Sequence, residues 1–377
     1  MHVPGPKTLV GGVRHGHELD TARLEAFLQQ RGSGFVMPIT LQQFNAGQSN
    51  PTYLVTDAAQ QRFVLRKKPP GELLSKTAHA VEREFRVLRA LGEHTDIPVP
   101  RVLALCEDTS VVGTPFYLME YLDGRVLSDV RLPQIAPGER LRYWEALVDV
   151  LARLHRVDYA AAGLAAHGRV GDYYGRQLRS LARVSAAQAA AVDGSGKAVG
   201  PLPRLADLLA WFGQQACPDE TTVVHGDFKM DNVIWHATEP RVIGILDWEM
   251  STLGNPRSDV ANLLQPLMLP FRGADSKEAT VLQGLRGAPA AEHAPSEQAL
   301  LERYCRAVGR VGPLVGWDFA RVFGLFRNAV IQQGVAARVA RGQASSAIAH
   351  VVGRSFPETM AYTMAIVDRS QARPSKL

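Results

Sequence analysis

The most constraining feature of this sequence is a short polar turn that lies between apolar runs. The segment TTVVHGDFKMDNVIWH extends from Thr221 to His236, and a further apolar run from Val242 leads to Asp247. Short apolar runs separated by turns predict three strands, so Asp227, Asn232 and Asp247 should lie where strands end. Functional sites commonly form at such sheet ends. The sequence therefore predicts a site built on this turn.

The spacing of these three residues suits the transfer of a phosphoryl group. That reaction needs a base aimed at the attacking hydroxyl, and cations over the charge that develops on the phosphate oxygens. An Asp, an Asn five residues later and a strand-end Asp match the base and the Mg²⁺ ligands of a kinase loop. We therefore assign Asp227 as the base, and Asn232 and Asp247 as ligands of Mg²⁺. A capped polar turn would explain His225-Gly226-Asp227 alone, but not the other two residues.

Composition limits the class of protein without deciding it. A chain of 377 residues is too long for one ordinary core and predicts two lobes or domains. The formal charge of +5 comes from scattered Lys and Arg with no basic stripe, so no nucleic-acid partner is expected. Cys106, Cys217 and Cys305 lack metal-ligand spacing and are expected to be reduced thiols. No apolar run reaches the ~18 residues of a membrane span, so we expect a cytoplasmic protein with no membrane partner.

The N-terminal third should bind the nucleotide phosphates. Short strands are predicted at Leu41 to Phe44, Tyr53 to Thr56 and Arg62 to Arg66. The turn before the second strand contains Ser49 and Asn50, whose polar groups could contact a phosphate. An ordinary hairpin turn explains the same residues equally well.

One cation at the end of the third strand should reach the α- and β-phosphates. Alternation along a strand puts Arg66 and Lys68 on one face and Lys67 on the other. We choose Arg66, although a solvated strand end remains the alternative. An amphipathic helix is predicted from Ala78 to Leu91, with Val81, Phe85, Leu88 and Leu91 on its apolar face. Glu84 lies beside that face and is predicted to pair with Arg66; Glu82, or a solvated Glu84, is the alternative.

The segment from Thr114 to Gly124 reads as a strand that runs into a turn. In a bilobal kinase this would be the hinge, whose backbone binds adenine, so Glu120 and Leu122 are assigned to the nucleotide site. A plain edge strand is the competing interpretation.

Together these segments resemble the aminoglycoside phosphotransferase and choline kinase-like superfamily, which has a protein-kinase-like fold. The resemblance spans roughly residues 38–340 and implies ATP and Mg²⁺ as cofactors and a small-molecule hydroxyl as acceptor. It rests on these residues of the sequence: Ser49-Asn50, Phe63 to Arg66, Glu84, Glu120, His225-Gly226-Asp227, Asn232 and Asp247-Trp248-Glu249.

The resemblance also implies an α+β bilobal fold. It comprises an N-lobe antiparallel sheet with one helix at residues 1–119, a hinge at 120–124 and a larger, mainly helical C-lobe at 125–377. Lys229 matches the lysine that touches the γ-phosphate, although a solvated loop cation is equally compatible. His225 and Asp259 would support the catalytic loop, and Asp259 could instead be a helix N-terminal carboxylate. Gly226 stands where protein kinases carry an arginine, which disfavours a protein substrate.

A closer resemblance is to the kinase domain fused ahead of acyl-CoA dehydrogenases, expected here as a free-standing protein. It is carried by FNAGQSNPTYLV, FVLRKKPPGELL and the segment HGDFKMDNVIWHATEPRVIGILDWEMSTLGNPRSDVAN. This resemblance implies a hydroxyacyl-CoA as the acceptor. The alternatives are an aminoglycoside or amino-alcohol kinase and, from another class, a nucleotide-binding pseudokinase-like scaffold. The oligomeric state is not predicted.

The remaining segments should form the substrate-selecting part. A helix is predicted from Leu141 to Val157, another from Ser258, and a third from Trp317 to Arg341 with an aromatic stripe that favours core. A mobile connection is predicted at Ala186 to Pro203. A second such stretch, Arg272 to Pro295, could be a lid or merely a loop. Six C-terminal arginines could meet the phosphates of an acyl-CoA, or could simply be solvated: Arg306, Arg310, Arg321, Arg327, Arg338 and Arg341.

Overall fold

The structure is a computed structural model that describes residues 10–31, 34–45, 50–69, 80–272, 284–344 and 348–372. The chain divides into two units. The first contains Met1–Ser128, Val157–His167 and His225–Thr252, and the second contains the intervening segments and the C-terminal part. Each unit is described by itself.

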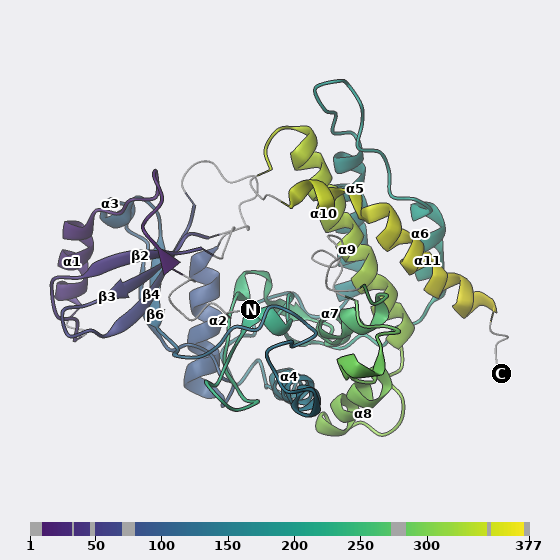
Figure 1. Ribbon diagram of the computed structural model, residues 1–377, viewed down its shortest axis with the longest axis horizontal. Helices are drawn as coiled ribbons and strands as arrows, with labels where there is room; N and C mark the ends of the chain where they lie inside the picture. Colours follow the sequence, from purple (N-terminus) through teal and green to yellow (C-terminus); the bar gives the residue numbers. More distant parts are fainter. Residues whose placement is uncertain are drawn as a thin grey trace. The chain divides into compact units, whose positions relative to one another are not determined.

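The first unit is built on an antiparallel sheet of six strands (Figure 1). The spatial order is β1 (Val10–Gly11), β2 (Thr40–Phe44), β3 (Thr52–Thr56), β4 (Arg62–Lys67), β6 (Phe116–Glu120) and β5 (Val102–Cys106). The interpretation of 114–124 as an edge strand is wrong. Because β5, which the sequence analysis did not predict, pairs with the outer side of β6, that strand is internal.

One face of this sheet forms an apolar core. Tyr53, Val55 and Leu65 are buried there against Leu24 and Leu28 of α1 (Thr21–Gln30). The short α3 (Thr109–Val112) adds Val112 to the same core. The α+β fold class is therefore confirmed, and α1 and α3 are additional to the one helix expected.

Helix α2 (Val81–His94) starts and ends later than the predicted range of 78–91. Residues 78 and 79 lie outside the described residues, and Ala80 has a non-helical backbone, so the helix begins at Val81. At the other end, the Thr95 hydroxyl donates a hydrogen bond to the Leu91 carbonyl oxygen at 2.6 Å, after the helix has ended at His94. The predicted apolar face is buried at Val81, Leu88 and Leu91.

The polar turn is bracketed by strands as the sequence predicts. Strand β8 (Val233–Trp235) pairs antiparallel with β9 (Val242–Ile245), which leads to Asp247. Two short 3₁₀ helices, η3 (Met230–Asn232) and η4 (Trp248–Met250), follow Lys229 and Asp247. The loop is thus followed directly by a paired strand.

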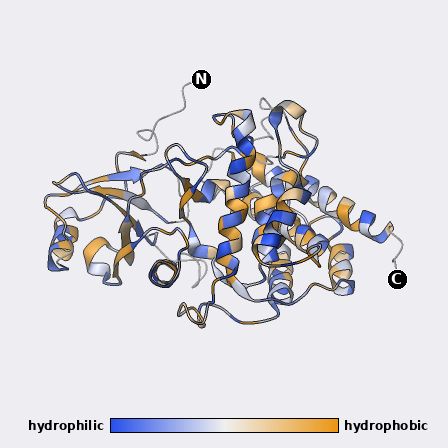
Figure 2. Ribbon diagram, turned by 90° about the horizontal axis from the view of Figure 1, so that it is seen from below, coloured by the Kyte–Doolittle hydropathy of each residue, from blue (hydrophilic) through white to orange (hydrophobic). Residues whose placement is uncertain are grey.

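The second unit is mainly helical. Figure 2 shows polar and apolar segments alternating along the helices, as expected for amphipathic helices that bury one side. Phe319, Phe323, Phe326 and Val330 of the longest helix are buried in its core, which confirms the predicted core stripe. The unit contains α4 (Arg140–His155), α5 (Tyr173–Ala189), α6 (Leu205–Gln214), α7 (Arg257–Met268), α8 (Glu297–Ala307), α9 (Trp317–Ala340), α10 (Ala349–Arg354), α11 (Phe356–Ala372) and the paired strands β7 (Thr222–Val224) and β10 (Thr252–Gly254).

One predicted connection differs from the structure, and part of the other lies outside the described residues. Ala186 to Ala189 form the end of α5, which was not predicted because this Ala-rich stretch was interpreted as a linker. The chain then makes a turn closed by a bridge between Val192 and Ala198. In the second connection, residues 273–283 lie outside the described residues. Among the described helices, none is long and apolar enough to cross a membrane.

Candidate active site

The loop predicted to be catalytic holds the Asp227 carboxylate with two donors. The Asn232 side-chain amide donates to both the Asp227 carbonyl oxygen and Oδ2, each at 2.9 Å. The Lys229 ammonium lies 3.2 Å from the same Oδ2. Gly226, directly before Asp227, has φ of +86°, a conformation that glycine adopts without a steric penalty. The predicted base and one predicted metal ligand are therefore in direct contact.

His225 ties this loop to the strand that delivers Asp247. Its ring is fully buried and Nε2 donates to the Leu246 carbonyl oxygen at 2.8 Å. Nδ1 accepts from the Asp227 backbone N–H at 3.2 Å, so the ring is the neutral Nε2–H tautomer. The ring also packs against Trp248, with 4.7 Å between centroids. These contacts give His225 the geometry of a structural support.

Arg66 is the centre of an ion-pair cluster in which Glu84 is fully buried and the other members are partly buried. Its Nε lies 3.0 Å from Glu84 Oε2, so the predicted pair is present. Its Nη2 lies 2.6 Å from Asp247 Oδ1 and 3.5 Å from Glu249 Oε2. The Trp248 backbone N–H donates to Glu84 Oε1 at 3.2 Å, which joins α2 to the segment after Asp247. The contact of Glu249 with Arg66 is not predicted by the sequence. In the sequence alone, Glu249 cannot be distinguished from a solvated turn residue.

Burial and neighbouring opposite charges shift the pKa values of Glu84 and Arg66 in opposite directions. Burial raises the pKa of Glu84 to about 7, against the opposing effect of the Arg66 guanidinium. Burial alone would lower the pKa of Arg66, but Glu84, Tyr117 and Asp247 together outweigh burial, so the pKa is raised. Arg66 therefore stays a cation, which suits the phosphate contact that the sequence predicts for it.

The two neighbouring lysines have other partners. Lys67 points to the other face of the sheet, where its buried Nζ donates to the Val112 carbonyl oxygen at 2.7 Å. Lys68 Nζ lies 2.5 Å from Glu82 Oε1. Of the three cations at the end of β4, Arg66 is therefore the one that faces Glu84 and Asp247.

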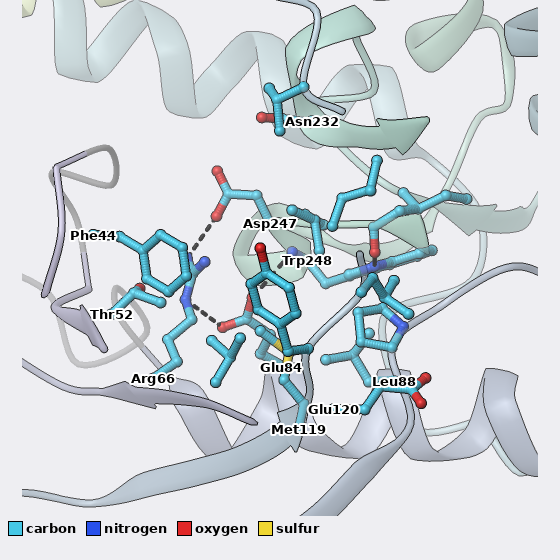
Figure 3. A pocket seen from close by; sticks show the side chains of 18 of the residues that line it. Phe44, Thr52, Arg66, Glu84, Leu88, Met119, Glu120, Asn232, Asp247 and Trp248 are labelled. Atoms are coloured by element: carbon cyan, nitrogen blue, oxygen red, sulfur yellow. Dashed lines mark hydrogen bonds and ion pairs between the residues drawn. The ribbon is translucent and has the colours of Figure 1, made fainter. Parts of the chain in front are cut away.

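A cavity of about 260 Å³ opens beside Arg66, entirely within the first unit (Figure 3). In the close-up, Arg66 lies between Glu84 and Asp247, and Asn232 lies beyond Asp247. Apolar walls come from Val64, Leu88, Met119, Leu122 and Ile245. A site with apolar walls and a few convergent charged groups is the usual form of a small-molecule pocket.

The structure brings most of the predicted nucleotide-site residues to this cavity. Glu120 and Leu122 line it, and the Glu120 carboxylate also accepts from the Arg101 backbone N–H at 2.8 Å. Asn50 is buried and its amide donates to Glu249 Oε2 at 3.4 Å. Ser49 lies outside the described residues. Asp231, which the sequence analysis did not select, is also part of the wall.

Other predicted residues lie elsewhere. Asp227 and Lys229 are not part of the cavity lining. Asp259 is fully buried in the second unit, where its Oδ2 lies 3.4 Å from Nε2 of His155. The His155 Nδ1 is 2.8 Å from the Tyr304 hydroxyl, so this histidine belongs to a hydrogen-bonded core.

Asn232 and Asp247 suit Mg²⁺ in their chemistry. The Asn232 amide nitrogen faces Asp227, which leaves its carbonyl oxygen as the ligand atom, and Asp247 supplies a partly exposed carboxylate. Mg²⁺ prefers such oxygen ligands and commonly takes only one or two from the protein, with phosphates and water completing the shell. Within the described residues, no group of three or more His, Cys, Asp or Glu is placed to hold a metal. The residues present therefore fit a metal shared with a bound phosphate.

Known proteins are similar to this chain in sequence and in fold. "Probable acyl-CoA dehydrogenase IBR3" of Arabidopsis thaliana is 40% identical over 349 residues, which are 90% of this chain and 41% of that protein. The chain thus spans less than half the length of this curated relative. A crystal structure from Ralstonia eutropha, provisionally named an aminoglycoside phosphotransferase, is 36% identical with a TM-score of 0.79, and the match covers 93% of this chain and 99% of that one.

The fold extends to more distant proteins. Wild-type aminoglycoside 2′-phosphotransferase-IIIa, solved as its GDP complex, has a TM-score of 0.58 at 14% identity over 91% of this chain and 99% of that one. A family model described as the phosphotransferase enzyme family matches residues 40–279. That match includes Arg66, Glu84, Asp227, Asn232 and Asp247. The chain belongs to the phosphotransferase enzyme family.

Proposed function

We propose that this chain transfers the γ-phosphoryl group of ATP to the hydroxyl of a small molecule. The observation that carries the proposal is the Arg66 guanidinium, held by the buried Glu84 and by Asp247 at a cavity that Asn232 also lines. A cation fixed in this way can hold the α- and β-phosphates. The Thr114–Gly124 segment would act as the hinge for adenine, with residues 1–119 as N-lobe and 125–377 as C-lobe.

In this mechanism Asp227 orients the acceptor hydroxyl and accepts its proton. The Asn232 amide holds the Asp227 carboxylate in place, and His225 fixes the loop against Leu246. Mg²⁺ at Asn232 and Asp247 would neutralise charge that develops on the phosphate oxygens. The reaction forms the bond from the acceptor oxygen to phosphorus and breaks the bond from phosphorus to the ADP oxygen.

The three cysteines are free thiols, which supports a reducing compartment such as the cytoplasm.

We propose a hydroxyacyl-CoA as the acceptor. The name of the Arabidopsis relative points to acyl-CoA chemistry, although this chain spans only 41% of that protein. The charges of the C-terminal segment support an anionic acceptor. This segment, residues 300–377, contains Glu302, Asp318, Glu358 and Asp368. Three of these four carboxylates are already paired with arginines, in the pairs Asp318–Arg321, Glu358–Arg272 and Asp368–Arg204. A cationic aminoglycoside would need free carboxylates.

The arginines expected to meet the CoA phosphates fall into two groups. Arg310 pairs with Glu220, Arg321 pairs with Glu297, and Arg327 donates to the Asn262 side-chain oxygen at 2.7 Å. These three hold the helical unit together. The exposed group is Arg306, Arg338 and Arg341. We therefore propose the exposed group, rather than Arg327, as the candidates for phosphate contact.

The acceptor is tested by turnover. Purified protein with MgATP should phosphorylate 4-hydroxyacyl-CoAs faster than aminoglycosides or amino alcohols, and free CoA should inhibit competitively against the acceptor. Charge reversal at Arg338 and Arg341 should raise the KM for the acceptor and leave the KM for ATP unchanged. Phosphorylation of kanamycin-like amines with no effect of CoA would overturn this acceptor while leaving the kinase. A chain that binds ATP but never turns it over would instead be a scaffold.

The base is tested by one substitution. Asp227→Asn should lower kcat by about 10²–10⁴, the usual range for a positioned general base, while MgATP binding persists. Asparagine keeps the size of the side chain, so the loop should stay folded. Full activity in Asp227→Asn would contradict the mechanism.

A further inference from the structure

The η3 turn brings a second carboxylate to Lys229. Lys229 has an extended backbone, and the turn that follows is closed by the Asn232 backbone N–H donating to the Lys229 carbonyl oxygen at 3.1 Å. Met230 is buried and anchors the turn. Because the chain folds back at this point, the Lys229 Nζ lies 3.7 Å from Asp231 Oδ2 as well as 3.2 Å from Asp227 Oδ2.

The ammonium group is therefore shared between two carboxylates of unequal role. Asp227 is the proposed base, and its Oδ2 already accepts from Asn232. Asp231 belongs to the wall of the cavity that also contains Asn232 and Asp247. Asp227 and Asp231 raise the pKa of Lys229 although burial alone would lower it, so the ammonium remains charged.

We propose that Asp231 is a positioning residue for Lys229. It draws the ammonium partly away from Asp227 and holds it at the edge of the nucleotide cavity, ready to meet the γ-phosphate. This inference rests on the proposed kinase function. Without Asp231, the lysine pairs with Asp227 alone, where it competes with the acceptor hydroxyl for the carboxylate.

The geometry also explains why the lysine can move. Both pairs are partly exposed, with Lys229 and Asp231 side chains each 43% accessible, and such pairs hold their partners weakly. A γ-phosphate carries more charge than either carboxylate, so the ammonium should transfer to it once the nucleotide is bound. The alternative is that Asp231 is only a turn carboxylate. In that case the effect of removing it on kcat would not depend on whether Lys229 is present.

A double-mutant cycle separates these two roles. Asp231→Asn should lower kcat by about tenfold, as expected when one member of a coupled pair is lost, with the KM for MgATP within about twofold. Asp231→Glu should recover most of the rate because it keeps the carboxylate. In a Lys229→Met background, Asp231→Asn should have less than about a twofold effect.

Rates are measured both with the acceptor and as ATP hydrolysis without it, so the cycle does not depend on the acceptor. An Asp231→Asn effect of the same size in the Lys229→Met background would overturn the inference. So would an effect confined to the KM for MgATP, or no rescue by Asp231→Glu. If the wild-type chain neither hydrolyses nor transfers phosphate from ATP, the kinase function itself fails, which is a different result.

Discussion

At the residue scale, the decisive choice is which cation at the end of β4 faces the cavity. Strand alternation predicts that Arg66 and Lys67 point to opposite faces, and Lys67 is indeed buried against Val112. Arg66 is then surrounded by three carboxylates, of which Glu84 is 1% exposed. A buried carboxylate that loses its cation is costly, so this pair should matter for stability as well as for binding.

Arg66→Met should destabilise the protein strongly. Removing one partner of a buried pair leaves an uncompensated charge, which costs about 3–5 kcal/mol of unfolding free energy. The matched control is Arg89→Met, because the pair of Arg89 with Glu93 is exposed on α2 and should contribute at most about 0.5 kcal/mol. Urea unfolding measures both. Equal effects of the two variants would show that Glu84 does not depend on Arg66.

His167 should make the protein sensitive to acid. Burial, together with Arg83 and Arg86, lowers its pKa from 6.5 to about 4. Between these values the unfolded state binds more protons, so the contribution to stability is lost as the pH falls from 6.5 towards 4. His167→Gln, which can keep the bond to Ser251, should therefore reduce the dependence of unfolding free energy on pH in this window.

Glu84 changes the unfolding free energy with pH in the opposite direction to His167. Its pKa is raised from 4.5 to about 7, so the folded state binds more protons between these values and loses stability as the pH rises. Glu84→Gln should make stability increase more steeply with pH, whereas His167→Gln should flatten it. Urea unfolding at several pH values compares the slopes. The same slope in the wild type and both variants would contradict these assignments.

At the element scale, the proposed catalytic loop depends on a close approach between two turns. Gly226 has φ of +86°, and a Cβ there would lie 2.5 Å from the Met250 carbonyl oxygen. The loop is thereby packed against the η4 turn that follows Asp247. A side chain at this position would have to move one of the two turns that carry the predicted site residues.

Gly226→Ala should therefore affect both stability and activity. A non-glycine residue in this conformation costs about 1–3 kcal/mol, and the displaced Asp227 should lower kcat by at least roughly tenfold. Gly213→Ala is the control, because this glycine of α6 has nothing within 4 Å of an added Cβ. That control should stabilise the helix by about 0.5–1 kcal/mol. Normal kcat in Gly226→Ala would show that the loop tolerates the shift.

At the scale of the whole molecule, the residues that line the proposed nucleotide cavity all belong to the first unit. The helical unit has its own core, in which Phe323 and Phe326 are at most 1% exposed. Ligand binding and helical packing should therefore contribute separately to thermal stability.

Saturating MgATP should raise the unfolding free energy by about 2.7 kcal/mol at a hundredfold excess over Kd. Asp247→Ala, or a chelator, should abolish this shift. Phe326→Ala should cost about 3–5 kcal/mol but leave the MgATP-dependent shift present. Scanning calorimetry with and without MgATP tests all three. A shift that survives Asp247→Ala would place the metal on another residue.

Much of the fold and of the site was predictable from the sequence because it depends on local pattern. The strands at Arg62–Lys67, Val233–Trp235 and Val242–Ile245 follow from short apolar runs between turns. Asp227 and Asn232 are five residues apart, so a single turn brings them together. The choice of Arg66 follows from strand alternation, which depends only on neighbouring residues.

The tertiary structure alone decided which distant groups meet. Arg66 and Asp247 are 181 residues apart, and only the packing of the first unit brings their side chains within 2.6 Å. Glu249 reaches Arg66 in the same way. Asp231 reaches Lys229 because the Met230 side chain is buried and turns the chain back. Periodicity in a sequence reports which side of an element a residue is on, whereas contacts between elements depend on how those elements pack.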